Sequence, residues 1–457
     1  MNKSKETAKY WFTVISDIFV TAYAAMVFGY VWFNRINDYM WIPFLNKGNW
    51  MMIIVYTILF VVMMVTFHGY QIGLGRVSQV ALSQVLASIF CNCISILLTI
   101  LVVGLVEFIG DIIVDHIIVV LFQCIGLVIL TFVLTKLRCK IFPPDRMLLV
   151  NGEYHNSLIN KLNSRPDRYV VAGQVSCDEK IDVIQSELKN YDAVLLNDVP
   201  TSVRNEILKA CFEEEKEVYF TPKISDILVK GTEELNVFDT PLYVSRNVGM
   251  SLPQRFIKRF GDILISLIGI IITSPIMLVT AILIKKYDGG PVFYKQTRST
   301  IGGKEFKVMK FRSMITDAEK DGKARLATEN DDRITPVGKF IRATRIDELP
   351  QFFNILKGDM SLVGPRPERP EINKEYYEEL PEFAYRLRVK AGLTGYAQVY
   401  GKYNTTSYDK LKLDLIYVER CSILLDIQLI LLTLRVVFTK DATEGLEEGQ
   451  TNASTKN

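Results

Sequence analysis

Histidine is scarce in this sequence, and its absence from most of the chain limits the chemistry available. Of the 457 residues only His68, His116 and His155 are histidines, so everything after residue 155 lacks an imidazole. Any catalysis there depends on carboxylates, lysine and arginine. The seven cysteines are scattered, odd in number and without a Cys-x-x-Cys pair, which argues against a disulfide framework or a zinc site.

Charge is nearly absent from long stretches of the N-terminal part, and this excludes a purely soluble protein. Four apolar runs lie at residues 11–33, 50–67, 80–106 and 117–135. A helix needs about 20 residues to cross about 30 Å of hydrocarbon, and each run meets or nearly meets that length. The first is too long and too aromatic for a cleaved signal peptide. We therefore predict four retained transmembrane helices in residues 1–140.

The charges that are present are unevenly distributed. Residues 141–250 carry 12 Lys/Arg and 18 Asp/Glu, whereas residues 251–440 carry 31 and 22. A basic block joined to membrane segments implies anionic partners such as lipid headgroups or phosphates. Basic residues flank the first and fourth runs, so we expect both ends of the four-helix bundle, and everything after it, in the cytosol. The acidic tail, residues 441–457, is predicted to be disordered.

Residues 141–250 predict a small Rossmann-like domain with a parallel α/β sheet. Helical patterns at 181–189 and 203–215 alternate with short apolar strands, at 147–150, 169–175, 193–196 and 218–220. The first strand leads to Gly152 alone, where a dinucleotide site needs Gly-x-Gly-x-x-Gly, and Glu153 would repel a pyrophosphate. We expect a structural or regulatory domain, and a nucleotide-cofactor sugar epimerase or dehydratase remains an alternative.

A fifth apolar run, residues 263–284, carries no charge and is long enough to span a membrane. Two basic residues precede it and two follow it, so both ends favour the cytosolic side. Ser274-Pro275 lies at its centre, and an interior proline removes a backbone hydrogen bond and kinks a helix. We predict a re-entrant hairpin over residues 256–286; a straight fifth span with a kink is the alternative.

Basic and amide side chains follow this hairpin closely. A Gly-Gly-Pro turn leads into Gln296 and Arg298, which we take as candidates for anion binding. Residues 306–314 alternate like a strand and would place Lys310 and Arg312 on one face. Two cations on one strand face form a plausible phosphate clamp, although a solvated face has the same pattern.

Two adjacent carboxylates, Asp347 and Glu348, stand before a short apolar helix pattern that ends at Gly358. We interpret Asp347 as the helix N-cap, where backbone amides favour an anion or a phosphoryl group. A carboxylate can attack phosphorus to give an acyl phosphate, and its neighbour can hold Mg²⁺. Arg342, shortly before, would stabilise transition-state charge. Simple helix capping is the competing interpretation.

Two further motifs stand later in the chain. Residues 364–368, Gly-Pro-Arg-Pro-Glu, form a rigid turn in which two prolines fix the backbone around Arg366, which suits a bidentate phosphate contact. Residues 391–401 follow with three glycines, and Lys402 comes directly after them.

Taken in order, residues 255–440 resemble the catalytic domain of the bacterial polyprenyl-phosphate glycosyl-1-phosphate transferases. The matching stretches are Ser274-Pro275, DGGPVFYKQTR, KFRSM, DELPQ, GPRPE, GLTGYAQV and KLDLIYVER. The whole chain is similar to the large subfamily. The resemblance implies a membrane protein of α and α/β parts with a four-helix bundle, a degenerate nucleotide fold at 141–250 and a monotopic catalytic domain at 251–440.

The resemblance also implies a reaction. Asp347 would attack the sugar-linked phosphorus of a UDP-sugar, release UMP, and pass the phosphosugar to undecaprenyl phosphate, which starts capsule or exopolysaccharide synthesis. Glu348 would match the Mg²⁺ ligand, and Arg342 and Arg366 the phosphate-binding arginines. Lys310 and Asp414 fall in matching motifs with less defined roles. Lys402 replaces the usual arginine, which weakens a bidentate role there.

The expected partners are therefore a UDP-sugar, with glucose or galactose favoured, undecaprenyl phosphate and membrane lipids. We expect no nucleic-acid partner, and the sequence leaves open whether the chain forms a homodimer. A non-catalytic scaffold of polysaccharide assembly is a second alternative to the enzyme.

Overall fold

The computed structural model describes residues 3–73, 75–152, 158–163, 165–245, 249–316, 331, 333–401 and 405–437. The chain forms two compact units, Met1–Pro222 and Lys223–Asn457. Each unit is described by itself below.

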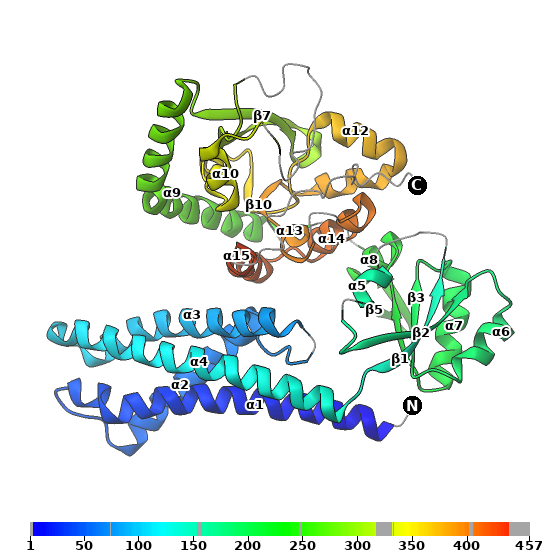
Figure 1. Cartoon of the computed structure of the whole chain (residues 1–457), viewed down its shortest axis with the longest axis horizontal. Helices are drawn as coiled ribbons and strands as arrows, with labels where there is room; N and C mark the ends of the chain where they lie inside the picture. Colours follow the sequence, from blue (N-terminus) through cyan, green and yellow to red (C-terminus); the bar gives the residue numbers. More distant parts are fainter. Residues whose placement is uncertain are drawn as a thin grey trace. The chain divides into compact units, whose positions relative to one another are not determined.

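Four long helices open the first unit, and they lie side by side (Figure 1). Each predicted apolar run is confirmed as a helix that extends beyond the run at one or both ends. Two 3₁₀ turns, Ile36–Tyr39 and Val106–Phe108, stand between them. The helices are α1 (Lys3–Asn34), α2 (Asn46–Thr66), α3 (Val77–Val103) and α4 (Ile109–Ile141). Together with one later helix they are long and apolar enough to cross a membrane, which indicates a multi-pass membrane protein.

The largely apolar interior between these helices contains a buried polar cluster, which the apolar runs did not predict. Gln123 of α4 is fully buried, and its amide bonds Tyr56 Oη, Ser88 Oγ and Asn92 Nδ2 at 2.8–3.0 Å. The polar residues of α3 recur every three or four positions and so share one face, at Gln84, Ser88, Asn92, Ser95 and Thr99. Lipid tails are as apolar as the apolar side chains of these helices, so the hydrophobic effect does not drive the helices together. Interhelical hydrogen bonds of this kind contribute to their association instead.

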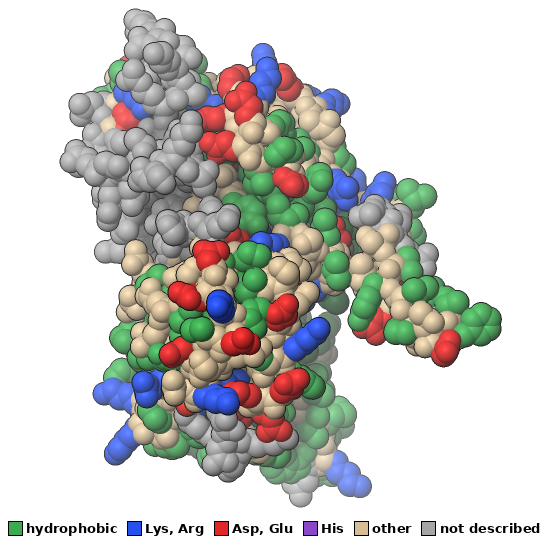
Figure 2. All heavy atoms as spheres, turned by 90° about the vertical axis from the view of Figure 1, so that its right-hand side faces the viewer, with side chains coloured by type: hydrophobic (Ala, Val, Ile, Leu, Met, Phe, Trp, Pro, Cys, Tyr) green, Lys and Arg blue, Asp and Glu red, His purple; other side chains and the backbone are tan. Residues whose placement is uncertain are grey.

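A four-stranded parallel sheet follows in strand order β2-β1-β3-β4. The predicted strands and the two predicted helices are confirmed. Helices α6 and α7 cover one face of the sheet, and α5 covers the other. Charged side chains of both signs are scattered over the outside of this domain (Figure 2). The elements are β1 (Asp145–Asn151), α5 (Leu158–Asn163), β2 (Tyr169–Ser176), α6 (Ile181–Leu188), β3 (Ala193–Asn197), α7 (Thr201–Glu213) and β4 (Glu217–Phe220).

The chain is in close backbone contact just after β1 and β3, at the edge of the sheet where such folds bind ligands. Gly152 N donates to the Asn197 carbonyl at 2.8 Å, so the two loops continue the strand pairing. A Cβ on Gly152 would lie 2.0 Å from the carbonyl oxygen of Asp198. Gly152 therefore serves a close approach of two backbones here, which is a structural role for the one glycine that the motif retains.

The second unit begins with a short helix and a two-stranded hairpin and continues with the long helix α9. The elements up to the middle of the unit are α8 (Ile224–Lys230), β5 (Glu233–Val237), β6 (Thr240–Val244), α9 (Leu252–Asp288), β7 (Phe293–Ser299) and β8 (Glu305–Phe311). Those that follow are α10 (Pro336–Ala343), α11 (Gln351–Lys357), β9 (Ser361–Val363), α12 (Pro370–Glu379), β10 (Gly392–Thr394), α13 (Tyr396–Tyr400), α14 (Ser407–Arg420) and α15 (Ile423–Val437). Their core is formed mainly by β8, α11, β9 and α15.

Helix α9 bends, and Figure 1 shows its two halves running in different directions. Pro275 lies inside it and has no N–H to give to the carbonyl of Ile271. The hydroxyl of Ser274 donates to that carbonyl at 2.8 Å instead. The Ser-Pro pair thus bends the helix without leaving this carbonyl unpaired.

Both halves of α9 pack against the same unit. In the first half, Asp262 Oδ1 accepts hydrogen bonds from Ser361 Oγ at 3.1 Å and Leu362 N at 3.0 Å. In the second half, Ile284 packs with Phe311 of β8 and Ile341 of α10. Most apolar side chains between these anchors are exposed.

Candidate active site

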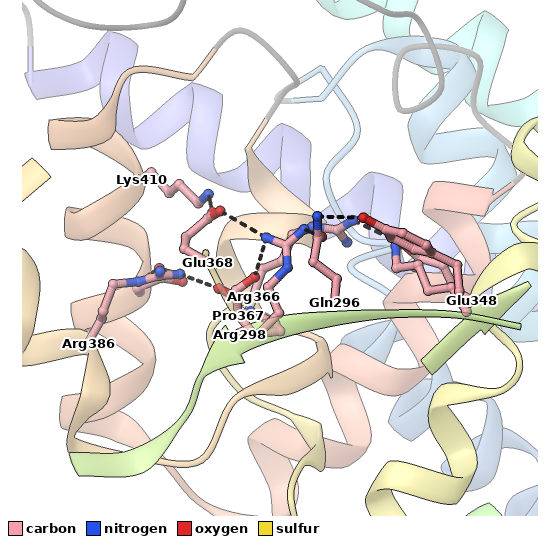
Figure 3. A network of polar contacts seen from close by, with 11 residues as sticks. Gln296, Arg298, Glu348, Arg366, Pro367, Glu368, Arg386 and Lys410 are labelled. Carbon is pink, nitrogen blue, oxygen red and sulfur yellow. Dashed lines mark hydrogen bonds and ion pairs between the residues drawn. The ribbon is translucent and has the colours of Figure 1, made fainter. Parts of the chain in front are cut away.

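A network of ion pairs and hydrogen bonds runs through the second unit (Figure 3). It includes three carboxylates, each paired with at least one cation: Glu348, Glu368 and Asp414. Its residues come from β7, β8, α14 and three short turns, so segments far apart in sequence build it.

Glu348 is the carboxylate with the most cations around it. Its Oε1 accepts from Lys310 Nζ at 2.8 Å and from Arg366 Nη2 at 3.0 Å, and Arg345 Nη1 lies 4.0 Å away. Burial would raise the pKa of Glu348, but these three cations outweigh it and hold the pKa well below its usual range. These cations therefore favour the ionised form of Glu348.

Asp347, its neighbour, is placed differently. It lies within the 3₁₀ turn Ile346–Glu348, whereas α11 begins at Gln351, so the predicted helix N-cap is wrong. Among the described residues no side chain hydrogen-bonds its carboxylate. Burial raises the pKa of Asp347; Glu348 raises it further, while Lys310, Arg342 and Arg345 oppose the rise. A half-buried carboxylate free of hydrogen bonds is a better nucleophile than a paired one.

The backbone just before Asp347 and Glu348 is strained, and the helix just after them is held by hydrogen bonds. Arg345 has φ of 58°, a left-handed conformation that non-glycine residues rarely adopt. After the pair, α11 ends at Gly358 with φ of 93°, and Arg259 of α9 donates to the carbonyls of Ile355 and Leu356 at 2.6 and 2.7 Å. The first half of α9 therefore fixes the short helix that follows the two carboxylates.

Arg366 is positioned by close contacts between glycine backbones. A Cβ on Gly364 would lie 2.1 Å from the carbonyl of Lys390, and one on Gly392 or Gly395 would collide with Gly364 itself at 2.1 Å. Only glycine fits at these three positions, because backbone meets backbone there. The motif at 391–401, which the sequence left without a role, thus supports the turn that carries Arg366.

Glu368, on the same turn, pairs with Lys410 and lies 3.6 Å from Arg298 Nη1. Burial opposes its ionisation, yet Lys410, Arg386 and Arg298 hold the pKa of Glu368 at about 2. Arg298 Nη2 in turn donates to Gln296 Oε1 at 2.6 Å. Gln296 and Arg298 are therefore fixed along β7 beside Arg366.

Asp414 lies behind this turn, in the interior. It forms an ion pair with Arg386 at 2.7 Å, and both side chains are 1% exposed. Arg386 Nη2 also donates to the backbone carbonyl of Arg366 at 2.8 Å. Asp414 therefore contacts Arg386 and acts on the site through it.

The structure does not bring every predicted residue into the network. Arg312 follows β8 and its guanidinium pairs with Asp288 and the carbonyl of Pro291, so it does not form a clamp with Lys310. Arg342 is half-buried in α10, close enough to Asp347 to lower its pKa. Lys402 lies outside the described residues. Ser274 and Pro275 lie in α9, as described above.

Sequence reasoning missed Glu368, Arg386 and Lys410. Glu368 could have been predicted, because it is the last residue of the Gly-Pro-Arg-Pro-Glu motif in which Arg366 was identified. Lys410 and Asp414 are four residues apart and share a face of α14, which helical spacing could have indicated. Arg386 lies in a 3₁₀ segment without a distinctive pattern.

The whole network lies within a recognised domain. A family model described as "Bacterial sugar transferase" matches residues 253–440. The UDP-glucose:undecaprenyl-phosphate glucose-1-phosphate transferase of Caulobacter vibrioides is 37% identical over 189 residues, which are 70% of that protein and 40% of this chain. The chain belongs to the bacterial sugar transferase family.

Other members of this sugar transferase family match over a longer part of the chain. A UDP-N-acetylgalactosamine-undecaprenyl-phosphate N-acetylgalactosaminephosphotransferase of Aeromonas hydrophila is 40% identical over 54% of this chain and 59% of its own length. A UDP-glucose:undecaprenyl-phosphate glucose-1-phosphate transferase of Klebsiella pneumoniae is 44% identical over 46% of this chain and 45% of its own length. The chain thus matches about half the length of each of these two relatives.

Proposed function

We propose that this sugar transferase family member moves a sugar 1-phosphate from a UDP-sugar to undecaprenyl phosphate, and so starts a capsule or exopolysaccharide repeat unit. The single observation that carries the proposal is that the neighbouring carboxylates of Asp347 and Glu348 have different surroundings. Lys310 and Arg366 bond the Glu348 carboxylate, whereas no described side chain hydrogen-bonds that of Asp347, and the pKa of Asp347 is raised while that of Glu348 is lowered. The names of the relatives support the choice of donor and acceptor.

The reaction has two displacements at one phosphorus atom. An oxygen of the Asp347 carboxylate attacks the phosphorus that bears the sugar, and the bond to the bridging oxygen breaks, so that UMP leaves. A phosphate oxygen of undecaprenyl phosphate then attacks the same phosphorus and breaks the bond to Asp347. The carboxylate is restored, and the product is a lipid-linked diphosphosugar.

The cations around the pair give this reaction its electrostatic support. Lys310 and Arg366 stand beside Glu348 and Arg342 lies near Asp347, so a diphosphate that approaches Asp347 meets fixed positive charge. Such preorganised charge stabilises the phosphorus centre as negative charge shifts to the leaving group.

Mg²⁺ is part of the proposal, and Glu348 is its candidate ligand. The described contacts of Glu348 all use Oε1, so Oε2 can take a metal ion. Among the described residues no group of three or more His, Cys, Asp or Glu side chains could hold one, which fits an ion that takes its other ligands from substrate phosphates and water. The ion would neutralise phosphate charge.

For the membrane arrangement, we propose a cytosolic catalytic domain and a re-entrant α9. The acceptor cannot leave the bilayer and the donor is water-soluble, so the chemistry belongs at the interface. Both halves of α9 pack on one compact unit, which supports a helix that enters and leaves by one face. The basic residues at both ends support the cytosolic side.

The test of this topology is cysteine labelling in a background without other cysteines. We expect Leu252→Cys and Lys286→Cys to react only from the cytosolic side, and Ser274→Cys to be protected by lipid. Labelling of the Lys286→Cys variant from the periplasmic side would show that α9 crosses the membrane.

The test of the chemistry uses the full chain in nanodiscs with undecaprenyl phosphate and a panel of UDP-glucose, UDP-galactose and UDP-N-acetylgalactosamine. We expect Asp347→Asn to lower UMP release on the order of 10⁴-fold. Without acceptor, the unmodified protein should show a phosphosugar mass on the peptide that contains residue 347. Asp359→Asn, whose carboxylate pairs only with Lys357 at 3.2 Å among the described residues, is the control. Full turnover in Asp347→Asn would show that Asp347 is not the nucleophile. Absence of UMP release from the unmodified protein with every donor would leave the scaffold as the better explanation.

A further inference from the structure

Helix α8 belongs to the catalytic unit, although the chain reaches it directly from the α/β domain. Pro222 ends the first unit, and α8 begins two residues later at Ile224. Ile227 of α8 is 5% exposed and packs with Phe383, Leu411 and Leu415. Helix α8 therefore completes a hydrophobic cluster within the second unit. It does so although it precedes residue 253, where the match to the sugar transferase family begins.

The same core touches the active-site network on its other side. The guanidinium of Arg386 lies over the ring of Phe383, 4.9 Å from its centroid. Arg386 pairs with Asp414 and donates to the carbonyl of Arg366. Arg366 then bonds Glu348. A series of direct contacts thus connects Ile227 with Glu348 by way of Phe383, Arg386 and Arg366, and the link between the two arginines is the backbone carbonyl of Arg366.

Helix α14 carries a second connection of the same kind. Leu411 and Leu415 face α8, and the residues just before them, Lys410 and Asp414, belong to the network. A shift of α14 toward a gap at Ile227 would therefore move both network residues as well.

We propose that α8 is a positioning element of the active site, with Ile227 as the residue through which it acts. The inference rests on the function proposed above. After its first proline, the turn around Arg366 is held by Arg298 Nη1 on the carbonyl of Pro367 at 3.1 Å, by Ser299 N on the carbonyl of Glu368 at 3.0 Å, and by Arg386 on the carbonyl of Arg366 at 2.8 Å. The last of these is the contact that leads back to α8. Two contacts fix the guanidinium of Arg386, the ion pair with Asp414 and the ring of Phe383, and both partners pack next to the residues that contact α8.

The experiment compares three full-length variants in nanodiscs. Ile227→Ala removes the contact, Ile227→Val restores most of it, and Val229→Ala truncates a side chain that is 57% exposed on the same helix. The KM for the UDP-sugar that the unmodified protein turns over is measured with saturating undecaprenyl phosphate. The KM does not change when part of a sample is unfolded, so it separates positioning from loss of folded protein.

We expect Ile227→Ala to raise KM about 2- to 30-fold, the range that coupling through packed side chains reaches. Ile227→Val should lie near the unmodified protein, and Val229→Ala should match it. An unchanged KM in Ile227→Ala, with turnover lowered only in proportion to unfolded protein, overturns the positioning role.

Hydrogen exchange decides the question without activity. We expect peptides that cover residues 364–368 and 383–388 to exchange faster in Ile227→Ala than in Val229→Ala. Equal exchange in the two variants overturns the positioning role of α8, whether or not the protein turns over a UDP-sugar. Absence of turnover in the unmodified protein would instead contradict the proposed function.

Discussion

At the scale of single residues, sequence adjacency does not decide what two carboxylates do. The Asp-Glu pair was readable from the chain, and so were the arginines on both sides of it. The different surroundings of the two side chains were not, because Lys310 comes from β8 and Arg366 from a turn after β9. Only the fold brings both cations to Glu348 and leaves Asp347 without a hydrogen bond from the described residues.

A pH profile can test this difference. The proposed attack by Asp347 needs the ionised form, so we expect turnover to fall as pH drops through its raised pKa. Lys310 lowers that pKa, and Lys310→Met should therefore move the acid limb of kcat to higher pH, on the order of one unit. Lys339→Met, at an exposed position of α10, is the control. An acid limb that stays in place, or moves to lower pH, would show that Asp347 does not set it.

At the scale of elements, hydropathy identified every long helix but did not indicate the polar side chains that the helices bury between them. Runs of apolar residues include Gln84, Ser88 and Asn92 of α3, each too isolated to lower the average. Their shared face became evident only when Gln123 of α4 was found against them. For α9 the reverse holds, because Ser274-Pro275 predicted the bend and the Ser274 hydroxyl explains how the helix tolerates it.

The buried polar cluster around Gln123 should be important for the stability of the N-terminal helices. Gln123→Leu leaves Tyr56, Ser88 and the carbonyl of Ala24 without their bonds to this amide. We expect a loss of about 2 kcal/mol or more, since each such bond in a membrane contributes roughly 0.6–2 kcal/mol. The measurement is the melting temperature of the purified protein in detergent, with Gln71→Leu, at an exposed position, as control. Equal melting temperatures would mean that this cluster does not stabilise the helices.

At the scale of the whole molecule, the boundary between the two compact units differs from the boundary that the change in charge composition indicates. The second unit begins at Lys223, whereas the change from acidic to basic composition placed a boundary near residue 250. Composition could not show that Ile224 and Ile227 pack with Phe383, because that contact joins positions more than 150 residues apart.

This boundary predicts how fragments behave. A fragment of residues 223–440 should be more stable than one of residues 250–440, because the shorter one uncovers Phe383, Leu411 and Leu415. Loss of a buried isoleucine to alanine alone costs about 2–5 kcal/mol. Melting temperature and aggregation of both fragments in the same detergent give the comparison. Equal stability would show that α8 adds nothing to this core.

The sequence by itself determined the elements: four N-terminal apolar helices, a parallel α/β sheet without a glycine fingerprint, and a kinked fifth helix. It also supplied most of the residues that we propose for a phosphate-handling site. These follow from periodicity, helix breakers and residue chemistry, which act over a few neighbouring positions. The tertiary structure decided which charges meet. Arg312 pairs with Asp288, Asp414 lies buried on Arg386, and Glu348 gathers its cations, because burial and long-range packing choose ion partners that no local pattern contains.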